Sequence, residues 1–249
     1  MDNARSVVII LMSVAVAKIS NAITQLNQKK EKKILMTKIK HASFDLDGTL
    51  VKSAKTIYKT TTNSLEQLGI QFNLPEAEFN KMIGQHFNDI FKHFKIIVPD
   101  FEHFIKIYKK NYFDFMNDSE LYDGVCETLS YLKENNIKIS LLTTKAQDQA
   151  EKIITHFNLD KYFDLIMGRR DGIPHKPSPE PLLMICKELD IKPTETIMIG
   201  DTELDILCGK NAGSITCAAT FGYREIEILK SYNPDYLINS LSEINQILI

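Results

Sequence analysis

From Ile39 onward, short apolar segments alternate regularly with helical segments, and this alternation restricts the possible folds. Five apolar segments have the length and composition of buried strands: 39–45, 137–143, 164–167, 196–201 and 214–220. A helical segment precedes each of the last four apolar segments: 124–135, 146–157, 179–189 and 203–212. Strands that alternate with helices form a parallel sheet covered on both faces. We therefore expect an α/β fold with a doubly wound parallel sheet.

A helical segment interrupts this alternation between residues 53 and 119. Apolar residues recur at helical spacing in three stretches, which begin near Ala54, after Pro75 and after Pro99. Nine of the thirteen phenylalanines lie between Phe72 and Phe115, so this segment can form a small aromatic core of its own. We expect an all-helical cap at 53–119, inserted into a Rossmann-like core made of 36–52 and 120–249.

Residues 1–35 precede the first strand and differ in character from the rest of the chain. Val7 to Ala17 is an apolar run broken only by Ser13, and it is shorter than the ~20 residues that a membrane-spanning helix needs. Ala15-Val16-Ala17 is similar to a signal-peptide cleavage site, but Asp2 lies in a leader that should be clearly positive. A natural chain start at Met36 is a further alternative. We favour an extension outside the fold and keep a signal peptide, and hence export, open as the alternative.

Composition and charge narrow the classes of partner. The 30 basic and 32 acidic residues give a net charge of −2 and are spread through the chain, without the clustered basic face that nucleic-acid binding needs. The four cysteines form no CxxC pair and lie in apolar segments, which is typical of buried thiols in a reducing compartment. We expect a cytoplasmic protein, a monomer or homodimer, that binds neither nucleic acid nor a membrane.

Two aspartates come directly after the first strand. In open α/β sheets, ligands bind at the carboxyl ends of the strands, and Asp45 and Asp47 lie at such an end, followed by Gly48. Two carboxylates so close together repel each other strongly unless a cation is present, and an all-oxygen site of this type suits Mg²⁺. The alternative is a turn or a helix cap, in which Asp and Gly are also common.

Asp201 and Asp205 follow the segment 196–201 in the same way. Asp201 is a natural further metal ligand. Two interpretations of Asp205 stay open, because Thr202 and Asp205 have the spacing of a capping box, while a carboxylate at this place can also support the metal ligands through hydrogen bonds.

Lys176 and Thr143 are the candidates for binding a phosphate. Lys176 lies in a proline-rich loop, where Ser178 as helix cap and Pro179 as first helical residue fix the start of a helix and so hold the lysine rigidly. Thr143 ends the segment 137–143, and a hydroxyl group together with backbone N–H groups at a helix start binds anions well.

The order of these segments along the chain resembles the four motifs of the haloacid dehalogenase superfamily, here DLDGTL, LLTTK, HKPSPEP and GDTELD. The similarity covers roughly Lys38 to Ile249, with the helical insert in a cap position. The later segment Phe221-Gly222-Tyr223-Arg224 resembles the phosphoglycolate phosphatase-like branch. One departure is Thr144, where that branch usually carries Asn, and this departure affects substrate contacts rather than the chemistry.

The resemblance implies a Mg²⁺-dependent phosphatase. Asp45 would attack phosphorus and form an aspartyl-phosphate, and Asp47 would act first as general acid and then as general base. Mg²⁺ would be held by a carboxylate oxygen of Asp45, the backbone carbonyl of Asp47, and Asp201. Thr143 and Lys176 would hold the transferred phosphoryl group.

The branch also implies a small phosphorylated metabolite as substrate, phosphoglycolate or a compound of similar size, with pyrophosphate as a near alternative. Gln85 and His86 in the cap, and the pair Arg169-Arg170, are candidates for binding the leaving group, since arginine binds carboxylates through two hydrogen bonds. A helix bend at Gly84 and a solvated loop are the alternatives for these two segments.

Two other functions remain as alternatives. A sugar phosphomutase of the same superfamily is the first, although Thr49 stands where such enzymes usually carry Val. A non-catalytic, receiver-like phosphoacceptor module is the second. The fold alone does not separate the two classes. The cap and the second aspartate, Asp47, argue against that module.

Overall fold

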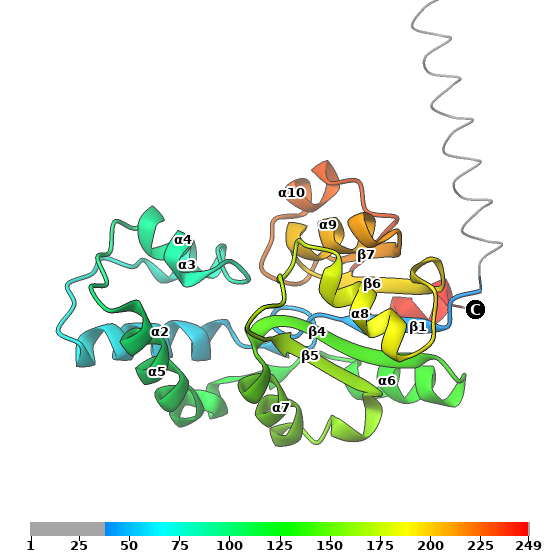
Figure 1. Ribbon diagram of the computed structural model, residues 1–249, viewed down its shortest axis with the longest axis horizontal. Coiled ribbons are helices and arrows are strands. Elements are labelled where there is room, and N and C mark those ends of the chain that lie inside the picture. Colours follow the sequence, from blue (N-terminus) through cyan, green and yellow to red (C-terminus); the bar gives the residue numbers. More distant parts are fainter. Residues whose placement is uncertain (1–37, 249) are drawn as a thin grey trace, which may run out of the picture. The chain divides into compact units, whose positions relative to one another are not determined.

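The computed structural model describes residues 38–248, in which the predicted strands assemble into one parallel sheet (Figure 1). Six strands lie in the order β5-β4-β1-β6-β7-β8. Their bounds are β1 (His41–Phe44), β4 (Lys138–Ala146), β5 (Leu165–Arg169), β6 (Thr196–Gly200), β7 (Ile215–Ala219) and β8 (Tyr236–Ile238). β1 lies in the middle of the sheet. β4 and β5 follow on one side of it, and β6, β7 and β8 follow on the other. This arrangement is doubly wound, so the predicted fold class is confirmed.

Helices cover both faces of the sheet (Figure 1). α6 (Val125–Glu134) and α7 (Gln147–His156) lie on one face, and α8 (Glu180–Glu188) and α9 (Glu203–Ala212) lie on the other. The change of face follows from the right-handedness of parallel crossovers, because the chain moves outward in one direction up to β5 and in the opposite direction afterwards. The short helices α10 (Ile226–Ser231) and α11 (Ile244–Ile247) complete the core.

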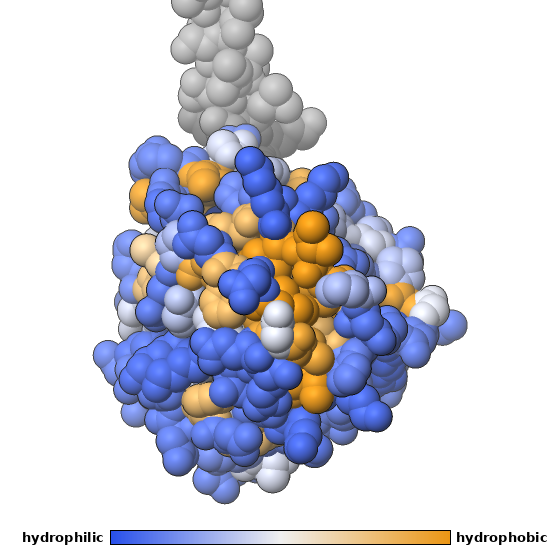
Figure 2. All heavy atoms as spheres, turned by 90° about the vertical axis from the view of Figure 1, so that its left-hand side faces the viewer, coloured by the Kyte–Doolittle hydropathy of each residue, from blue (hydrophilic) through white to orange (hydrophobic). Residues whose placement is uncertain are grey.

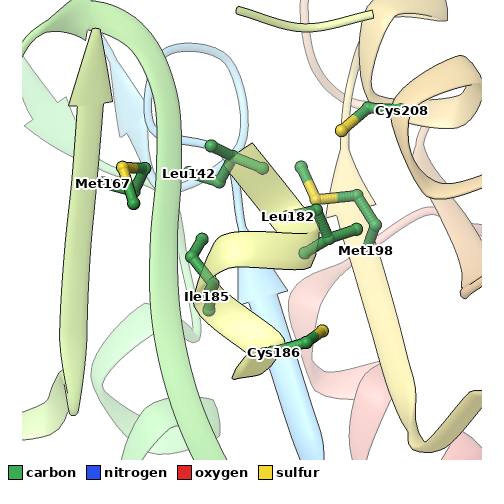
Figure 3. Close-up of a cluster of buried hydrophobic side chains, with 7 residues drawn as sticks. All are labelled: Leu142, Met167, Leu182, Ile185, Cys186, Met198 and Cys208. Carbon is green, nitrogen blue, oxygen red and sulfur yellow. The ribbon is translucent and has the colours of Figure 1, made fainter. Parts of the chain in front are cut away.

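α8 is fixed to the sheet by a cluster of buried side chains (Figure 3). The cluster contains residues of β4, β5, β6, α8 and α9: Leu142, Met167, Leu182, Ile185, Cys186, Met198 and Cys208. Each fully buried aliphatic side chain of this kind contributes roughly 1.5–3 kcal/mol relative to an exposed one. The cluster therefore holds the strand ends and the helix that follows Lys176 in a fixed relation.

The helical insert lies between two short strands, β2 (Val51–Lys52) and β3 (Glu120–Leu121), which pair antiparallel at its base. It contains α2 (Ala54–Gln67), α3 (Glu76–Asn80), α4 (Phe87–His93), α5 (Phe101–Asn111) and the 3₁₀ helix η1 (Tyr112–Asp118). Phe87 and Phe91 each pack edge to face on Phe104, with ring centroids 5.3 Å apart for Phe87–Phe104 and 4.9 Å apart for Phe91–Phe104. This is the aromatic core that the phenylalanine distribution predicted.

The second apolar stretch of the cap is two helices rather than one bent helix. α3 and α4 are separated by the turn 81–86, in which Gly84 has a φ of 97°, a conformation that favours glycine. A Cβ atom at Gly84 would lie 3.2 Å from Cγ2 of Thr202 in the core. The turn therefore faces the carboxyl ends of the strands. Gly84 interrupts the helical segment, and the alternative of a simple helix bend is wrong.

Figure 2 shows the cap end of the molecule, where hydrophobic residues gather within a polar surround. A groove of about 520 Å³ lies in the cap and is lined in part by Leu68, Ile70, Ile97 and Pro99, of which Ile97 is 81% exposed.

Within 38–248, no helix has the length and apolar character needed to cross a membrane. Residues 1–35, and with them the predicted extension, lie outside the described part of the chain, and the cytoplasmic location stays a prediction.

Candidate active site

Three carboxylates meet beyond the carboxyl ends of β1 and β6. Asp45 follows β1, Asp201 follows β6, and Asp205 lies in the first turn of α9, with one oxygen of each within 4.8 Å of the others. Lys176 reaches this cluster from the loop before α8, and its Nζ donates to Oδ1 of Asp45 at 2.7 Å and to Oδ1 of Asp205 at 2.5 Å. The structure therefore brings together four residues that lie far apart in the sequence.

Asp201 is completely buried and held by two donors. Its Oδ1 accepts from Oγ1 of Thr49 at 3.2 Å, and its Oδ2 accepts from the backbone N–H of Tyr223 at 2.8 Å. A Cβ atom at Gly48, where φ is 87°, would lie 2.3 Å from Oδ2 of Asp201. The glycine after Asp47 is thus required both by its backbone conformation and by the close approach of this carboxylate.

Burial and mutual repulsion shift the pKa values of the carboxylates in this cluster, and Lys176 partly offsets the shift. Burial raises the pKa of Asp45 to about 7, against the opposing effect of Lys176. Burial, followed by the repulsion of Asp45 and Asp205, raises the pKa of Asp201 well above its ordinary value. Burial alone would lower the pKa of Lys176, but the carboxylates of Asp205 and Asp45 raise it. The lysine therefore stays charged, while the carboxylates require further positive charge.

Asp47 lies beside this cluster and is held on both of its oxygens. Oγ of Ser53 donates to Oδ1 of Asp47 at 2.5 Å, and Nζ of Lys145 lies 3.2 Å from Oδ2. The Lys145 ammonium also lies 4.3 Å from the centre of the Tyr112 ring, a favourable cation–π contact. Although burial lowers the pKa of Lys145, the charge of Asp47 and its neighbours raises it above its ordinary value.

The charge balance of these residues fits a divalent cation. Asp45, Asp47, Asp201 and Asp205 would carry four negative charges, and the ammonium groups of Lys145 and Lys176 offset two of them. The remaining two negative charges, on oxygen ligands only, match Mg²⁺, which is bound by carboxylates and water. The carboxylates close enough to share one ion are those of Asp45, Asp201 and Asp205.

Of the two interpretations of Asp205, the structure shows the helix cap, and support of the metal ligands stays a prediction. Its Oδ2 accepts from the backbone N–H of Thr202 at 3.0 Å and from the Thr202 hydroxyl at 2.7 Å, which caps α9. Its Oδ1 accepts from Lys176. The same carboxylate therefore fixes the helix start and the position of the lysine.

Thr143 and the loop of Lys176 differ in detail from the expectation. β4 continues to Ala146, three residues beyond the predicted end, so Thr143 lies inside the strand, where its Oγ1 accepts from the backbone N–H of Lys145 at 3.2 Å. α8 begins at Glu180 with Pro179 as its cap residue, so the prediction of Ser178 as the cap was wrong by one position. Lys176 is nevertheless only 3% exposed.

A cavity of about 100 Å³ lies between the cap and the core and contains both Asp45 and Asp47 in its wall. Gln85, His86 and Arg169 also line this cavity. Burial, followed by the charges of Arg169 and His175, lowers the pKa of His86. Three of the four residues predicted to contact the leaving group therefore lie near the aspartates.

Arg170, the fourth, points elsewhere. Its Nε donates to Oε1 of Gln147 at 3.1 Å, and another of its nitrogens donates to the backbone carbonyl of Ile166 at 3.4 Å. Arg170 is not among the residues of the cavity wall that contains Asp45. Arg170 thus connects β5 to the start of α7, and of this pair Arg169 lines the cavity that contains Asp45. Both arginines line a smaller cavity beside Thr143 and Lys176, and a contact of Arg170 with the leaving group stays a prediction.

Comparison with known proteins identifies the family. The model of the haloacid dehalogenase-like hydrolases matches residues 43–219. The chain belongs to this family and is an enzyme of the phosphatase type, which confirms the predicted family and enzyme class.

Individual relatives cover most of the chain. The chain is 34% identical over 214 residues to the pyrophosphatase PpaX of Bacillus mycoides (strain KBAB4), covering 85% of this chain and 97% of that protein. It is 32% identical over 203 residues to the phosphoglycolate phosphatase of Aquifex aeolicus (strain VF5), covering 81% and 92%. The crystal structure of a predicted phosphoglycolate phosphatase from Haemophilus somnus 129PT matches with a TM-score of 0.74 at 25% identity, over 86% of this chain and all of that one.

Sequence reasoning missed three residues next to Asp47: Ser53, Lys145 and Tyr223. A signal for Lys145 was present, because residues two apart on a strand lie on the same face, and Lys145 follows Thr143 at that spacing. Ser53 contacts Asp47 directly, and Tyr223 reaches it through Ser53. Both contacts depend on the tertiary fold, and local sequence does not indicate them.

Proposed function

We propose that this protein is a Mg²⁺-dependent phosphatase that hydrolyses a small phosphorylated anion through an aspartyl-phosphate on Asp45. The observation that carries the proposal is the contact of Lys176 with Asp45 inside a cluster of carboxylates. A buried lysine beside a buried carboxylate suits phosphoryl transfer, in which positioning and charge neutralisation supply most of the catalysis.

Asp45 attacks phosphorus while Asp47 protonates the oxygen that leaves, so that a phosphoryl group remains on Asp45. Asp47 then takes a proton from water as the water attacks the phosphoryl group, which releases phosphate and restores Asp45. Lys176 and Thr143 bind the phosphoryl oxygens. Asp45, Asp201 and the backbone carbonyl of Asp47 would hold a Mg²⁺ ion, which would supply positive charge to offset that of the phosphoryl group.

The cavity supports a compact substrate with a second negative group. Its volume of about 100 Å³ suits a small anion, and Lys109, Lys145 and Arg169 are cationic residues of its wall. The carboxylate of phosphoglycolate or the second phosphate of pyrophosphate has the charge that these side chains would bind. Relatives of this chain carry both names, phosphoglycolate phosphatase and pyrophosphatase.

Phosphate release with a panel of substrates tests the proposal. We expect Mg²⁺-dependent hydrolysis of phosphoglycolate or pyrophosphate, loss of activity in EDTA, and recovery when Mg²⁺ is added in excess. Undiminished turnover in the chelator would remove the metal from the mechanism. Preference for nucleotides, hexose phosphates or phosphopeptides would contradict the substrate class but not the phosphatase chemistry.

Assays on the same purified protein also distinguish the phosphatase from the alternative functions. A phosphomutase would convert one sugar phosphate into an isomer without releasing phosphate. A receiver-like module would retain phosphate on Asp45 without turnover. Either outcome would contradict the proposed phosphatase.

A further inference from the structure

Behind Asp47 lies a short chain of hydrogen bonds that ends at Tyr223. Oγ of Ser53 donates to Oδ1 of Asp47 at 2.5 Å. The Tyr223 hydroxyl lies 3.1 Å from Oγ of Ser53 and accepts from the backbone N–H of Ser53 at 2.8 Å. Because the serine proton goes to Asp47 and the backbone proton goes to the tyrosine, the phenolic proton is left for Oγ of Ser53 or for the carbonyl of Val51, which is 3.5 Å away.

Tyr223 is tied to both halves of the site. Its side chain reaches Asp47 through Ser53, and its backbone N–H donates to Oδ2 of Asp201 at 2.8 Å. Burial raises the pKa of Tyr223 well above its ordinary value, so the phenol stays neutral and keeps its proton. The contact of this hydroxyl group with Ser53 restricts the orientation of the serine side chain.

The two oxygens of Asp47 are thereby made different. Oδ1 accepts from Ser53, which is not part of the cavity wall, whereas Oδ2 pairs with Lys145, which lines the cavity. Oδ2 is therefore the oxygen on the side of the cavity. An unrestrained aspartate side chain turns readily about its last torsion and exchanges its two oxygens. A general acid must instead present one oxygen to the leaving group in a fixed geometry.

We propose that Tyr223 is a positioning residue for Asp47: through Ser53 it keeps Oδ1 occupied, so that Oδ2 is the oxygen that delivers and later receives the catalytic proton. The inference rests on the proposed function. As the bond between phosphorus and the leaving oxygen breaks and the bond from Asp45 to phosphorus forms, Oδ2–H passes its proton to the leaving oxygen. In the second step, Oδ2 takes one proton from water, the water oxygen bonds to phosphorus, and the bond between phosphorus and Asp45 breaks.

The substitution Tyr223→Phe tests this, because it removes one hydroxyl group and keeps the ring. The ratio kcat/KM reports the steps up to departure of the leaving group, so it is measured with two compact substrates. The alkoxide of phosphoglycolate must be protonated to leave, whereas the acetate of acetyl phosphate leaves without a proton. We expect kcat/KM to fall about tenfold for phosphoglycolate, a part of the ~10²–10⁴ that general acid catalysis supplies, and to change less than about twofold for acetyl phosphate.

Tyr122→Phe is the matched control. The Tyr122 ring lies 4.9 Å from that of Phe221, next to the same loop, and its hydroxyl makes no hydrogen bond to any residue in 38–248. We expect this variant to match the wild-type protein on both substrates. If Tyr223→Phe fails to fold, Ser53→Ala carries the test and should show the same selective loss.

The outcomes separate the two proposals. An equal loss on both substrates, or no loss on either, would overturn the role of Tyr223 while the phosphatase stands. If the wild-type protein hydrolyses neither substrate with Mg²⁺, the proposed function fails, and the role of Tyr223 fails with it.

Discussion

Asp45 lies in surroundings that disfavour its charged form, since burial raises its pKa to about 7. The substitution Asp45→Asn removes the attacking oxygen but keeps the volume of the side chain and an oxygen that can accept from Lys176. We expect turnover to fall by at least ~10³-fold, in the range seen when a nucleophile is removed. Because the change also removes one of several mutually repelling buried charges, the melting temperature should not decrease. Phosphate release and thermal unfolding measure the two effects.

An aspartate on the surface provides the control. Asp114 is exposed in η1, so Asp114→Asn should change neither turnover nor stability. Activity of Asp45→Asn within tenfold of the wild-type value would rule out the covalent mechanism.

At the scale of single residues, the site side chains that follow strand ends could be predicted from the sequence. Those that reach the site from other parts of the fold could not. Asp45, Lys176 and Asp201 could be found because each lies in a short motif beside a predicted strand or helix start. Ser53 and Tyr223 are 170 positions apart, and their contact depends on how the loop after β7 folds over the base of the cap. Local sequence carries no information on such a contact.

His41 opens β1 and shows how a strand residue can make stability depend on pH. Its ring nitrogens bond to Oγ1 of Thr196 at 3.1 Å and to Oγ of Ser140 at 2.8 Å, and Ser140 also bonds to Ser43. Burial lowers the pKa of His41 from 6.5 to about 4, against a smaller opposing effect of Asp164. Between these two values the unfolded chain binds a proton that the folded chain does not, so the free energy of unfolding falls as pH falls from 6.5 toward 4.

Urea denaturation at pH 7 and pH 5 measures this contribution. At pH 5, His41 should account for a loss of about 2 kcal/mol, since each unit below the unfolded pKa is worth ~1.4 kcal/mol. His41→Gln should lose that much less stability between the two pH values than the wild-type protein. His156→Gln, at an exposed position, should leave the difference unchanged. An unaltered pH dependence in His41→Gln would contradict the assignment.

The turn between α3 and α4 is the element that brings Gln85 and His86 to the cavity, and Arg224 holds it. The Arg224 side chain is buried, pairs with Glu203 at 2.5 and 3.1 Å, and donates to the backbone carbonyl of Lys81. Arg224→Lys keeps the charge but cannot make all these bonds at once. We expect kcat/KM for the preferred substrate to fall about tenfold, equivalent to ~1.4 kcal/mol for the lost charged hydrogen bond.

Lys81 offers a control in the same turn. Its ammonium pairs with Glu225 at 2.7 Å, with both side chains about 60% exposed, and such surface pairs contribute roughly 0–1 kcal/mol. Lys81→Met should therefore change kcat/KM less than about threefold. Equal effects of the two substitutions would mean that Arg224 has no special part in holding the turn.

Elements with a strong repeating pattern were predicted well, and those that depend on pairing partners were not. α9 was expected at 203–212 and is found there, because Thr202 and Asp205 mark its start locally. The hairpin of β2 and β3 has two residues in each strand, too few for a period to appear. Strand β8 (Tyr236–Ile238) has three residues and is defined by its pairing with β7. The break at Gly84 is fixed by contact with the core rather than by glycine alone.

At the scale of the whole molecule, cap and core make one working unit. Ile39–Ile249 forms a compact unit in the chain, and the aspartates and Lys176 of the core share a site whose cavity is closed by residues of the cap. Besides the two connecting strands, ion pairs link the two parts, among them Lys109 of α5 with Asp148 of α7 at 2.9 Å. A substrate has to enter between the parts, so binding and the position of the cap are coupled.

Catalysis by the whole chain should not depend on residues 1–35. Every residue of the candidate site lies between Asp45 and Arg224, and each of their hydrogen-bond partners described above lies after Lys38. A chain that starts at Met36 should therefore show kcat and KM values within about twofold of the full-length protein, and the same melting temperature, in parallel assays with Mg²⁺. A truncated protein that is insoluble, melts earlier or loses turnover would show that the first 35 residues pack on the core, which would contradict the prediction of an extension outside the fold.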